Sequence, residues 1–141
     1  MALPQPEDLS SLVLRADFSD DAKWRELQEA IEREESGEGD GTFVSDRAYE
    51  GVTVQALVEE DAAADEEEKV TYLFLADAVT MADAEHLLLA VDLFEEPGRT
   101  FRVPPRWFPG ISANLSIANM DFAEFADDVD AAGVFRGFKD G

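Results

Sequence analysis

The sequence predicts a single-domain α/β protein with a mixed sheet of five or six strands and three helices. Two observations predict this fold. Short apolar runs alternate with helix-like stretches along the first half of the chain, and a strand–turn–strand pattern follows in the second half. Strands joined by helical crossovers pair in parallel, whereas a hairpin pairs antiparallel. We therefore expect a parallel front part, in which the first strand lies between the second and third, and a hairpin towards one edge.

The length of 141 residues and the absence of an internal repeat favour one domain over residues 1–141. A chain of this size buries roughly two-thirds of the surface that its unfolded form exposes, which is enough for a core without disulfides or metal. The hydrophobic fraction of 45% excludes a wholly disordered chain.

Three apolar runs predict the buried strands of the front part. They cover residues 12–16, 42–45 and 70–76, and each is closed or followed by an aspartate, namely Asp17, Asp46 or Asp77. Between the first two runs, Trp24, Leu27 and Ile31 recur at the spacing of one helix face, so a helix is expected there. Thr53 is a suitable N-cap for a second, small helix over residues 54–60.

An acidic run separates this small helix from the third strand. Seven of the ten residues 59–68 are acidic and none is basic. Like charges repel one another, and carboxylates are unsuited to a core. The run therefore predicts a mobile acidic loop.

The second half begins with a hairpin. Residues 87–94 form its first strand, the Glu95-Glu96-Pro97-Gly98 turn follows, and residues 100–103 return. Within it, Asp92 is equally a candidate to pair with Arg102 across the ladder and a further candidate ligand for a metal ion. Three prolines between residues 104 and 109 predict an irregular stretch, followed by a short strand over 115–118.

The last helix is predicted from a capping box and an apolar stripe. Asp121 and Glu124 have the capping-box spacing, in which each side chain satisfies the other residue's amide. The apolar stripe consists of Phe122, Phe125 and Val129. The helix is expected to end at Gly133. Phe135 and Phe138 are expected to dock the tail onto the body of the protein.

Composition and charge exclude several classes of function. The chain has no cysteine and one histidine, His86, so cysteine sites and multi-histidine metal sites within one chain are excluded. The 33 acidic residues outnumber 11 basic ones and give a net charge of −22, which argues against nucleic acid or an anionic membrane as a direct partner. No apolar run reaches membrane-spanning length, and the N-terminus lacks the features of a signal peptide. We expect a cytoplasmic protein; its oligomeric state is open.

Three segments carry a resemblance to a known family. They are residues 14–21, 91–103 and 114–122, which read LRADFSDD, VDLFEEPGRTFRV and NLSIANMDF. In these segments the chain resembles a family of small acidic actinobacterial proteins catalogued as a domain of unknown function. The resemblance implies a single domain and a bacterial source, and it implies no activity, substrate or catalytic residue.

A first set of candidate site residues follows from the predicted topology. Asp17, Asp46 and Asp77 would all lie at the carboxyl edge of a parallel sheet, where ligands of open α/β folds bind. Two or three carboxylates within reach could hold Mg²⁺, which prefers oxygen ligands. A small magnesium-dependent enzyme is therefore one hypothesis. The competing interpretation is that each aspartate caps a turn or a helix.

A second set points to protein binding without catalysis. Arg106 and Trp107 lie in a stretch without acids, and both residue types are enriched at binding hot spots, although such rings also fill cores. Asp121, Glu124, Asp127 and Asp128 would form an acidic helical face. The leading hypothesis is a non-enzymatic acidic binding protein, such as an immunity protein or inhibitor, that occupies a basic surface of a partner protein and needs no cofactor. The third hypothesis is a soluble scaffold protein whose charge serves only solubility.

Overall fold

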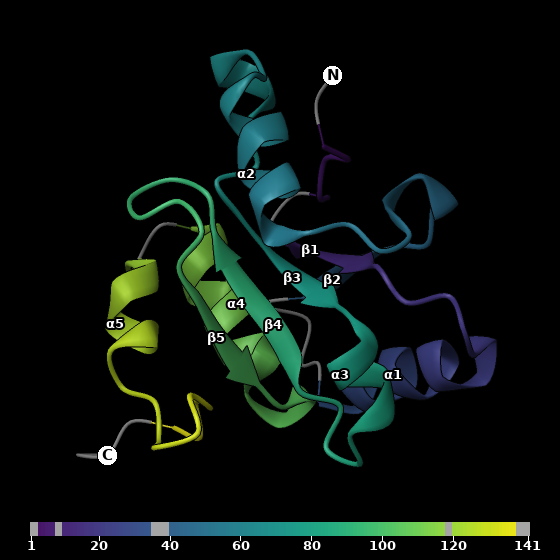
Figure 1. Cartoon of the computed structure of the whole chain (residues 1–141). Coiled ribbons are helices and arrows are strands. Elements are labelled where there is room, and N and C mark those ends of the chain that lie inside the picture. The colour runs from purple at the N-terminus through teal and green to yellow at the C-terminus, as the bar shows by residue number, and fades with distance from the viewer. Residues whose placement is uncertain (1–2, 8–9, 35–39, 118–119, 138–141) are drawn as a thin grey trace.

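The protein is a mixed five-stranded sheet with helices on both faces, as the computed structural model in Figure 1 shows. The structure describes residues 3–7, 10–34, 40–117 and 120–137. The strand order is β2-β1-β3-β4-β5. The strands are β1 (Ser10–Arg15), β2 (Asp40–Val44), β3 (Tyr72–Ala76), β4 (Leu88–Asp92) and β5 (Thr100–Val103).

The pairing follows the predicted pattern. β1 pairs in parallel with both β2 and β3, while β3–β4 and β4–β5 are antiparallel. The mixed sheet, the position of β1 between β2 and β3, and the hairpin at one edge are therefore confirmed. This order places a topological switch point at the carboxyl ends of β1 and β3.

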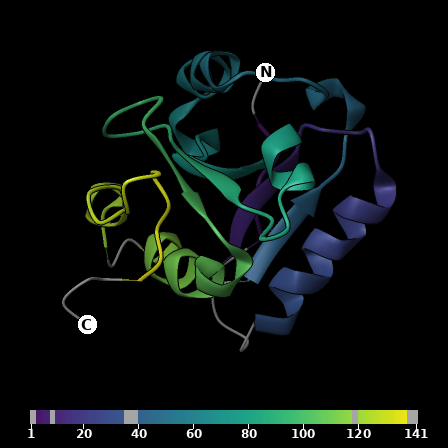
Figure 2. The same cartoon turned by 60° about the horizontal axis from the view of Figure 1, so that its bottom comes forward.

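Both faces of the sheet are covered because side chains alternate along buried strands. In β1, Val13 belongs to one apolar cluster, which includes residues of α1 (Asp21–Glu34) and α4 (Phe108–Ser116). Leu12 and Leu14 belong to the other cluster, which includes Leu57 of α2 (Val54–Ala62). Figure 2 shows α1 and α4 on one side of the sheet and α2 on the other. Phe135 is buried, as expected, whereas Phe138 lies outside the described residues.

The structure has five α-helices within its described residues, not the predicted three. The two additional helices are α3 (Ala78–Ala82) and α4. The predictions of an irregular stretch and of a strand over 115–118 are wrong, because Leu115 and Ser116 lie in α4. Pro109 is compatible with that helix since it stands in the first turn, where a backbone N–H is not needed.

The acidic run 59–68 includes helical structure, whereas a loop was predicted. Residues 59–62 form the end of α2, and Glu66–Glu68 form a 3₁₀ turn. Asp61 is only 1% exposed and accepts hydrogen bonds from the amides of Val70 (2.8 Å) and Thr71 (3.3 Å). Thr71 has a φ of 70°, which is rare for a β-branched residue. A buried carboxylate thus fixes the entry into β3, and the expectation that this run stays out of the core fails at Asp61.

The last helix is shorter than the apolar stripe indicates. α5 (Phe122–Ala126) begins with the predicted capping box, but it ends before Val129. Asp127 and Asp128 therefore follow the helix instead of extending one helical face. Asp92 does not pair with Arg102, which lies opposite Leu89 in the ladder. The Asp92 carboxylate instead accepts hydrogen bonds from the amides of Phe94 (2.9 Å) and Glu96 (3.0 Å) and holds the hairpin turn.

Asp61→Ala should lower the free energy of unfolding by about 3 kcal/mol, because it removes the charged acceptor of two largely buried amides. Urea denaturation measures the change. Asp65→Ala is the matched control, since Asp65 is exposed and makes no side-chain capping bond. Equal midpoints for the two variants would show that Asp61 does not hold the start of β3.

Candidate functional site

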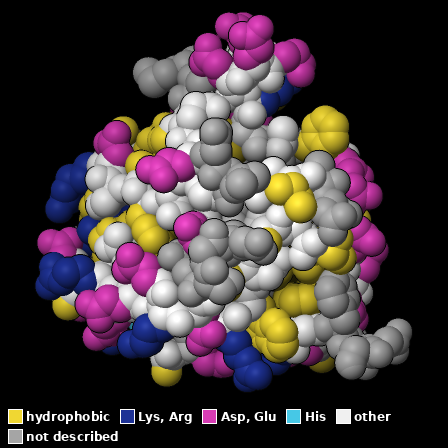
Figure 3. All heavy atoms as spheres, turned by 180° about the vertical axis from the view of Figure 1, so that it is seen from behind, with side chains coloured by type: hydrophobic (Ala, Val, Ile, Leu, Met, Phe, Trp, Pro, Cys, Tyr) yellow, Lys and Arg dark blue, Asp and Glu magenta, His cyan; other side chains and the backbone are white. Residues whose placement is uncertain are grey.

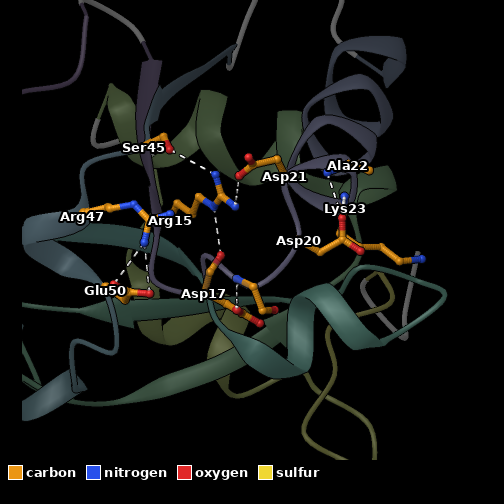
Figure 4. Close-up of polar contacts among 10 residues, drawn as sticks. Arg15, Asp17, Asp20, Asp21, Ala22, Lys23, Ser45, Arg47 and Glu50 are labelled. Atoms are coloured by element: carbon orange, nitrogen blue, oxygen red, sulfur yellow. Dashed lines mark hydrogen bonds and ion pairs between the residues drawn. The ribbon is translucent and has the colours of Figure 1, made fainter.

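Arg15 is the best-buried basic residue at the carboxyl edge of the sheet. It is the last residue of β1 and only 3% exposed. Its Nε donates to the Asp17 carbonyl (2.9 Å), and its two Nη atoms donate to Ser45 Oγ (3.3 Å) and Asp21 Oδ1 (2.7 Å), as Figure 4 shows. The bond from Arg15 holds the pKa of Asp21 below its usual value. One guanidinium thus joins the ends of β1 and β2 to the start of α1.

Aromatic rings complete the surroundings of Arg15. Its guanidinium carbon lies 4.4 Å from the centroid of the Phe18 ring and 5.6 Å from that of Trp24. The guanidinium of Arg47 lies 5.1 Å from the Phe18 ring and pairs with Glu50 at 3.4 Å. The contacts of Arg15 with Phe18 and Trp24 offset part of the cost of burying its charge. The arginine therefore has a structural role at the edge where ligands usually bind.

Asp77 follows β3 and forms a second ion pair at the same edge. Its two carboxylate oxygens accept from the Nη atoms of Arg102 at 2.9 and 2.8 Å, and Oδ1 caps α3 through the Thr80 amide at 3.1 Å. Burial alone would raise the pKa of Asp77, but the hydrogen bonds from Arg102 and Thr80 outweigh burial and lower it. Asp77 is thus both a helix cap and the partner of an arginine from β5.

The other two predicted metal ligands also cap local structure. Asp17 accepts from the Ser19 amide and Asp46 from the Ala48 amide, both at 2.9 Å. Asp17 and Asp77 do line one hollow of about 490 Å³, together with Glu50. Asp46 does not line it. Within the described ranges, no three histidine, aspartate or glutamate side chains are grouped in a way that could hold a metal ion.

The predicted acidic helical face is divided among local roles. Asp121 and Glu124 form the capping box of α5. Asp127 pairs with Arg99, which also binds Glu96 at 2.7 Å. Asp128 lies just after the helix. The structure therefore does not gather these acids on one helix.

Carboxylates are more exposed at the end of α2. Glu59, Asp65, Glu66, Glu67 and Glu68 are all exposed there. In the view of Figure 3, acidic side chains crowd the projecting tip at the top of the molecule, where α2 lies in Figure 1. Lys69 pairs with Glu66 at 3.2 Å and neutralises one of these five carboxylates. The other four keep this acidic tip strongly negative.

Arg106 and Trp107 lie in a 3₁₀ turn, Pro105–Trp107, directly before α4. Arg106 is exposed, and its guanidinium carbon lies 5.1 Å from the centroid of the half-buried Trp107 ring. The indole also makes an edge contact with Phe135, with ring centroids 6.2 Å apart. Trp107 is thus neither sealed in the core nor freely projecting.

A hollow of about 280 Å³ beside the hairpin turn was not predicted. It is lined by Thr71, Tyr72, Asp92, Phe94, Glu95, Leu115, Met120, Asp121 and Phe122. Phe94 is 68% exposed, which is high for a phenylalanine. The Asp121 carboxylate is the main reason that the pKa of Glu95 is raised above its usual value. The sequence signal for this hollow is an aromatic residue placed directly before the acidic turn Glu95-Glu96.

Residues 10–138 match a family described as a domain of unknown function, DUF6924. The chain belongs to this family. The matched range includes the carboxyl edge, the hollow beside Phe94 and the Arg106–Trp107 turn, so these features lie within the DUF6924 domain. No curated protein matches the chain.

No membrane-spanning helix is found in this DUF6924 domain, because none of its described helices is long and apolar enough to cross a bilayer.

Arg102→Met should lower the free energy of unfolding by about 2–3 kcal/mol at neutral pH, because it leaves the half-buried Asp77 without its cation. The pKa of Asp77 is lowered by pairing, so the stabilisation exists above the carboxyl's ordinary pKa and is lost as pH falls through the folded value. The gap between the variant and the wild type should therefore narrow towards about pH 3. Asp77→Asn, which keeps a capping side chain, is the control; a gap independent of pH would contradict the assignment.

The magnesium hypothesis has its own test. We expect Mg²⁺ to raise Tm no more than NaCl of equal ionic strength, because Asp77 is neutralised by Arg102 and both Asp17 and Asp77 serve as caps. Thermal denaturation with each salt measures the difference. A stabilisation specific to Mg²⁺ that disappears in Asp17→Asn would instead favour the metal-dependent enzyme.

Proposed function

We propose that this DUF6924 member is a non-enzymatic binding protein that occupies a basic surface of a partner protein, as an immunity protein or inhibitor does. The observation that carries the proposal is the hollow beside Phe94. There an exposed aromatic ring stands next to Glu95 and Asp121, two carboxylates that repel each other. This combination is suited to a lysine or arginine side chain.

A cationic side chain would gain three interactions in this hollow. The face of an exposed phenylalanine attracts a cation by about 0.5–1 kcal/mol, and more when water is excluded. Glu95 and Asp121 each provide a carboxylate for pairing, and a positive charge between them removes their mutual repulsion. The volume of about 280 Å³ is small, so the hollow suits one side chain and not a large ligand.

The remaining charge of the chain supports the same class of partner. The ion pairs of the described residues engage most of the described lysines and arginines, whereas many of the described acids, including most of the acidic tip, take part in none of these pairs. A net charge of −22 steers a cationic protein towards this surface and can raise association rates tenfold to a thousandfold at low salt. It also disfavours nucleic acid and anionic membranes as direct partners.

The proposal includes a setting for the protein. The lysine-poor, alanine-rich composition is that of a G+C-rich genome, which supports an actinobacterial source, and the sequence features favour the cytoplasm. A magnesium-dependent enzyme is the alternative, and the salt comparison above distinguishes it.

Phe94→Ala should weaken binding of a fluorescent hexalysine peptide about twofold to fivefold, because the peptide loses the aromatic wall of the hollow. Fluorescence anisotropy at low and high salt measures the affinity. Val79→Ala is the matched control, since Val79 is another exposed apolar residue, 50% accessible, at a different hollow. Equal affinities for the two variants would remove the Phe94 hollow from the proposal, and binding that ignores salt would contradict the charge argument. The same pair of variants then tests any cationic protein captured from the native host.

Glu95→Gln should stabilise the protein and weaken hexalysine binding together. The pKa of Glu95 is raised in the folded state, chiefly by Asp121, so the repulsion is absent below the ordinary carboxyl pKa and grows as pH rises through the folded value. The gain in Tm should therefore be largest at neutral pH and vanish towards about pH 3. Thermal denaturation and anisotropy measure the two effects. Glu59→Gln, in the acidic tip, controls for loss of one charge; identical behaviour of the two variants would show that Glu95 has no special role.

A further inference from the structure

Two adjoining hollows surround Trp107, on a part of the molecule distinct from the hollow beside Phe94. The first has a volume of about 480 Å³ and is lined by Arg33, His86, Arg106, Trp107 and Arg136, among other residues. The second has a volume of about 400 Å³ and is lined by apolar groups that include Ile111, Phe125 and Phe135. Trp107 and Arg136 line both hollows. A basic space and an apolar space therefore meet at one indole ring.

The basic hollow is unusual in a chain with a net charge of −22. The hollow beside Phe94 and the hollow at the carboxyl edge each contain carboxylates and no basic side chain. Here three arginines converge with His86, against two glutamates, Glu34 and Glu85. Arg136 neutralises Glu85 through two bonds of 2.7 and 2.9 Å. The lining thus keeps an excess of positive charge.

Two of these arginines are available to a ligand. Among the ion pairs of the described residues, none involves Arg33 or Arg106. Both are exposed, and Arg106 is held over the Trp107 ring. Carboxylates are abundant in this chain, yet neither guanidinium pairs with one from the described part of it. A planar guanidinium binds a carboxylate or phosphate through two parallel hydrogen bonds, so the pair is suited to an anionic head group.

The apolar hollow has rigid aromatic walls. Phe135 makes edge contacts with Trp107 and with Phe125, at centroid distances of 6.2 and 5.4 Å. Gly137 closes one side with a φ of 93°, and a Cβ there would lie 3.0 Å from Trp107 Cη2. The backbone therefore approaches the indole closely at a position where a side chain would collide with it. A flat ring fits such walls better than a branched chain does.

We propose that the hollows around Trp107 bind a small organic anion, whose flat apolar ring lies against Trp107, Ile111 and Phe125 and whose head group pairs with Arg33 and Arg106. Each hollow lies within the size range of small-molecule sites, and the combination of apolar walls with a few polar groups is typical of them. The head group is a carboxylate or a phosphate, since both match the guanidinium fork. The site is independent of the surface proposed to bind a cationic partner.

Isothermal titration calorimetry with 1-naphthoate, 1-naphthyl phosphate and the neutral 1-naphthamide tests the proposal on the full chain. We expect at least one of the two anions to bind at least about tenfold more tightly than the amide, because the amide cannot form the charged bonds. The tighter of the two anions identifies the head group. No binding of either anion at millimolar concentration, or equal binding of the anions and the amide, would overturn the proposal.

Variants locate the site. Arg106→Gln and Arg33→Gln should each weaken binding of the preferred anion about tenfold and leave 1-naphthamide unchanged. Arg25→Gln is the matched control, because Arg25 is an exposed arginine near the opposite end of α1 and does not line the hollow. Tm values equal to that of the wild type confirm that the variants fold. Equal weakening by Arg25→Gln would overturn the proposal, since the effect would then reflect net charge alone.

Discussion

Scarcity of positive charge is the constraint on which the rest of this structure depends. With 33 acids and 11 bases, few carboxylates can have a basic partner. The positions of the arginines therefore determine which carboxylates are neutralised within the fold. Arg15 and Arg102 are the two that neutralise the carboxyl edge of the sheet. Each reaches across elements, Arg15 to the start of α1 and Arg102 to the cap of α3. Where an arginine is lacking, carboxylates bind backbone amides instead, as Asp61 and Asp92 do. A buried charge satisfied by amide donors needs no counterion nearby.

Because the arginines bind side chains at the switch point, this edge of the sheet differs from the usual ligand crevice. In open α/β folds the carboxyl ends of the central strands form the usual ligand crevice. Here Asp77 is bound by Arg102 and caps α3, Asp17 caps a turn, and the guanidinium of Arg15 is bound on three sides. Side chains that already hold the fold together are less free to bind a ligand. Side chains with fewer such roles lie elsewhere, namely Phe94 and Glu95 at the hairpin turn and Arg106 at the turn before α4.

The sheet could be predicted from the sequence because each strand is marked by a local pattern. The candidate sites could not, because their residues come from segments far apart in the sequence. The apolar runs and the hairpin turn give the strands and their order. The sequence does not predict α4 because prolines usually break helices, although Pro109 in the first turn costs no hydrogen bond. The hairpin offers Asp92 as one possible partner for Arg102, but the actual partner, Asp77, lies 25 residues earlier. The hollow beside Phe94 combines the start of β3, the hairpin turn and the segment before α5. Only the topology brings these three segments together, so the sequence signal, Phe94 before the acidic turn, indicates one wall of the hollow and not the other two.

The placement of Glu95 bears on whether the acidity serves only solubility. Charged side chains increase solubility wherever they lie on the surface, and the protein is most stable when like charges lie apart. Glu95 instead lies where Asp121, Asp92 and Glu96 all raise its pKa, next to the most exposed large apolar side chain among the described residues. The repulsion destabilises an isolated protein, and the exposed ring gains no burial on folding that a partner could not improve. A cationic side chain bound between them would relieve the repulsion and cover the ring at once. The scaffold hypothesis offers no compensation for either feature, which is why the binding hypothesis accounts better for this turn.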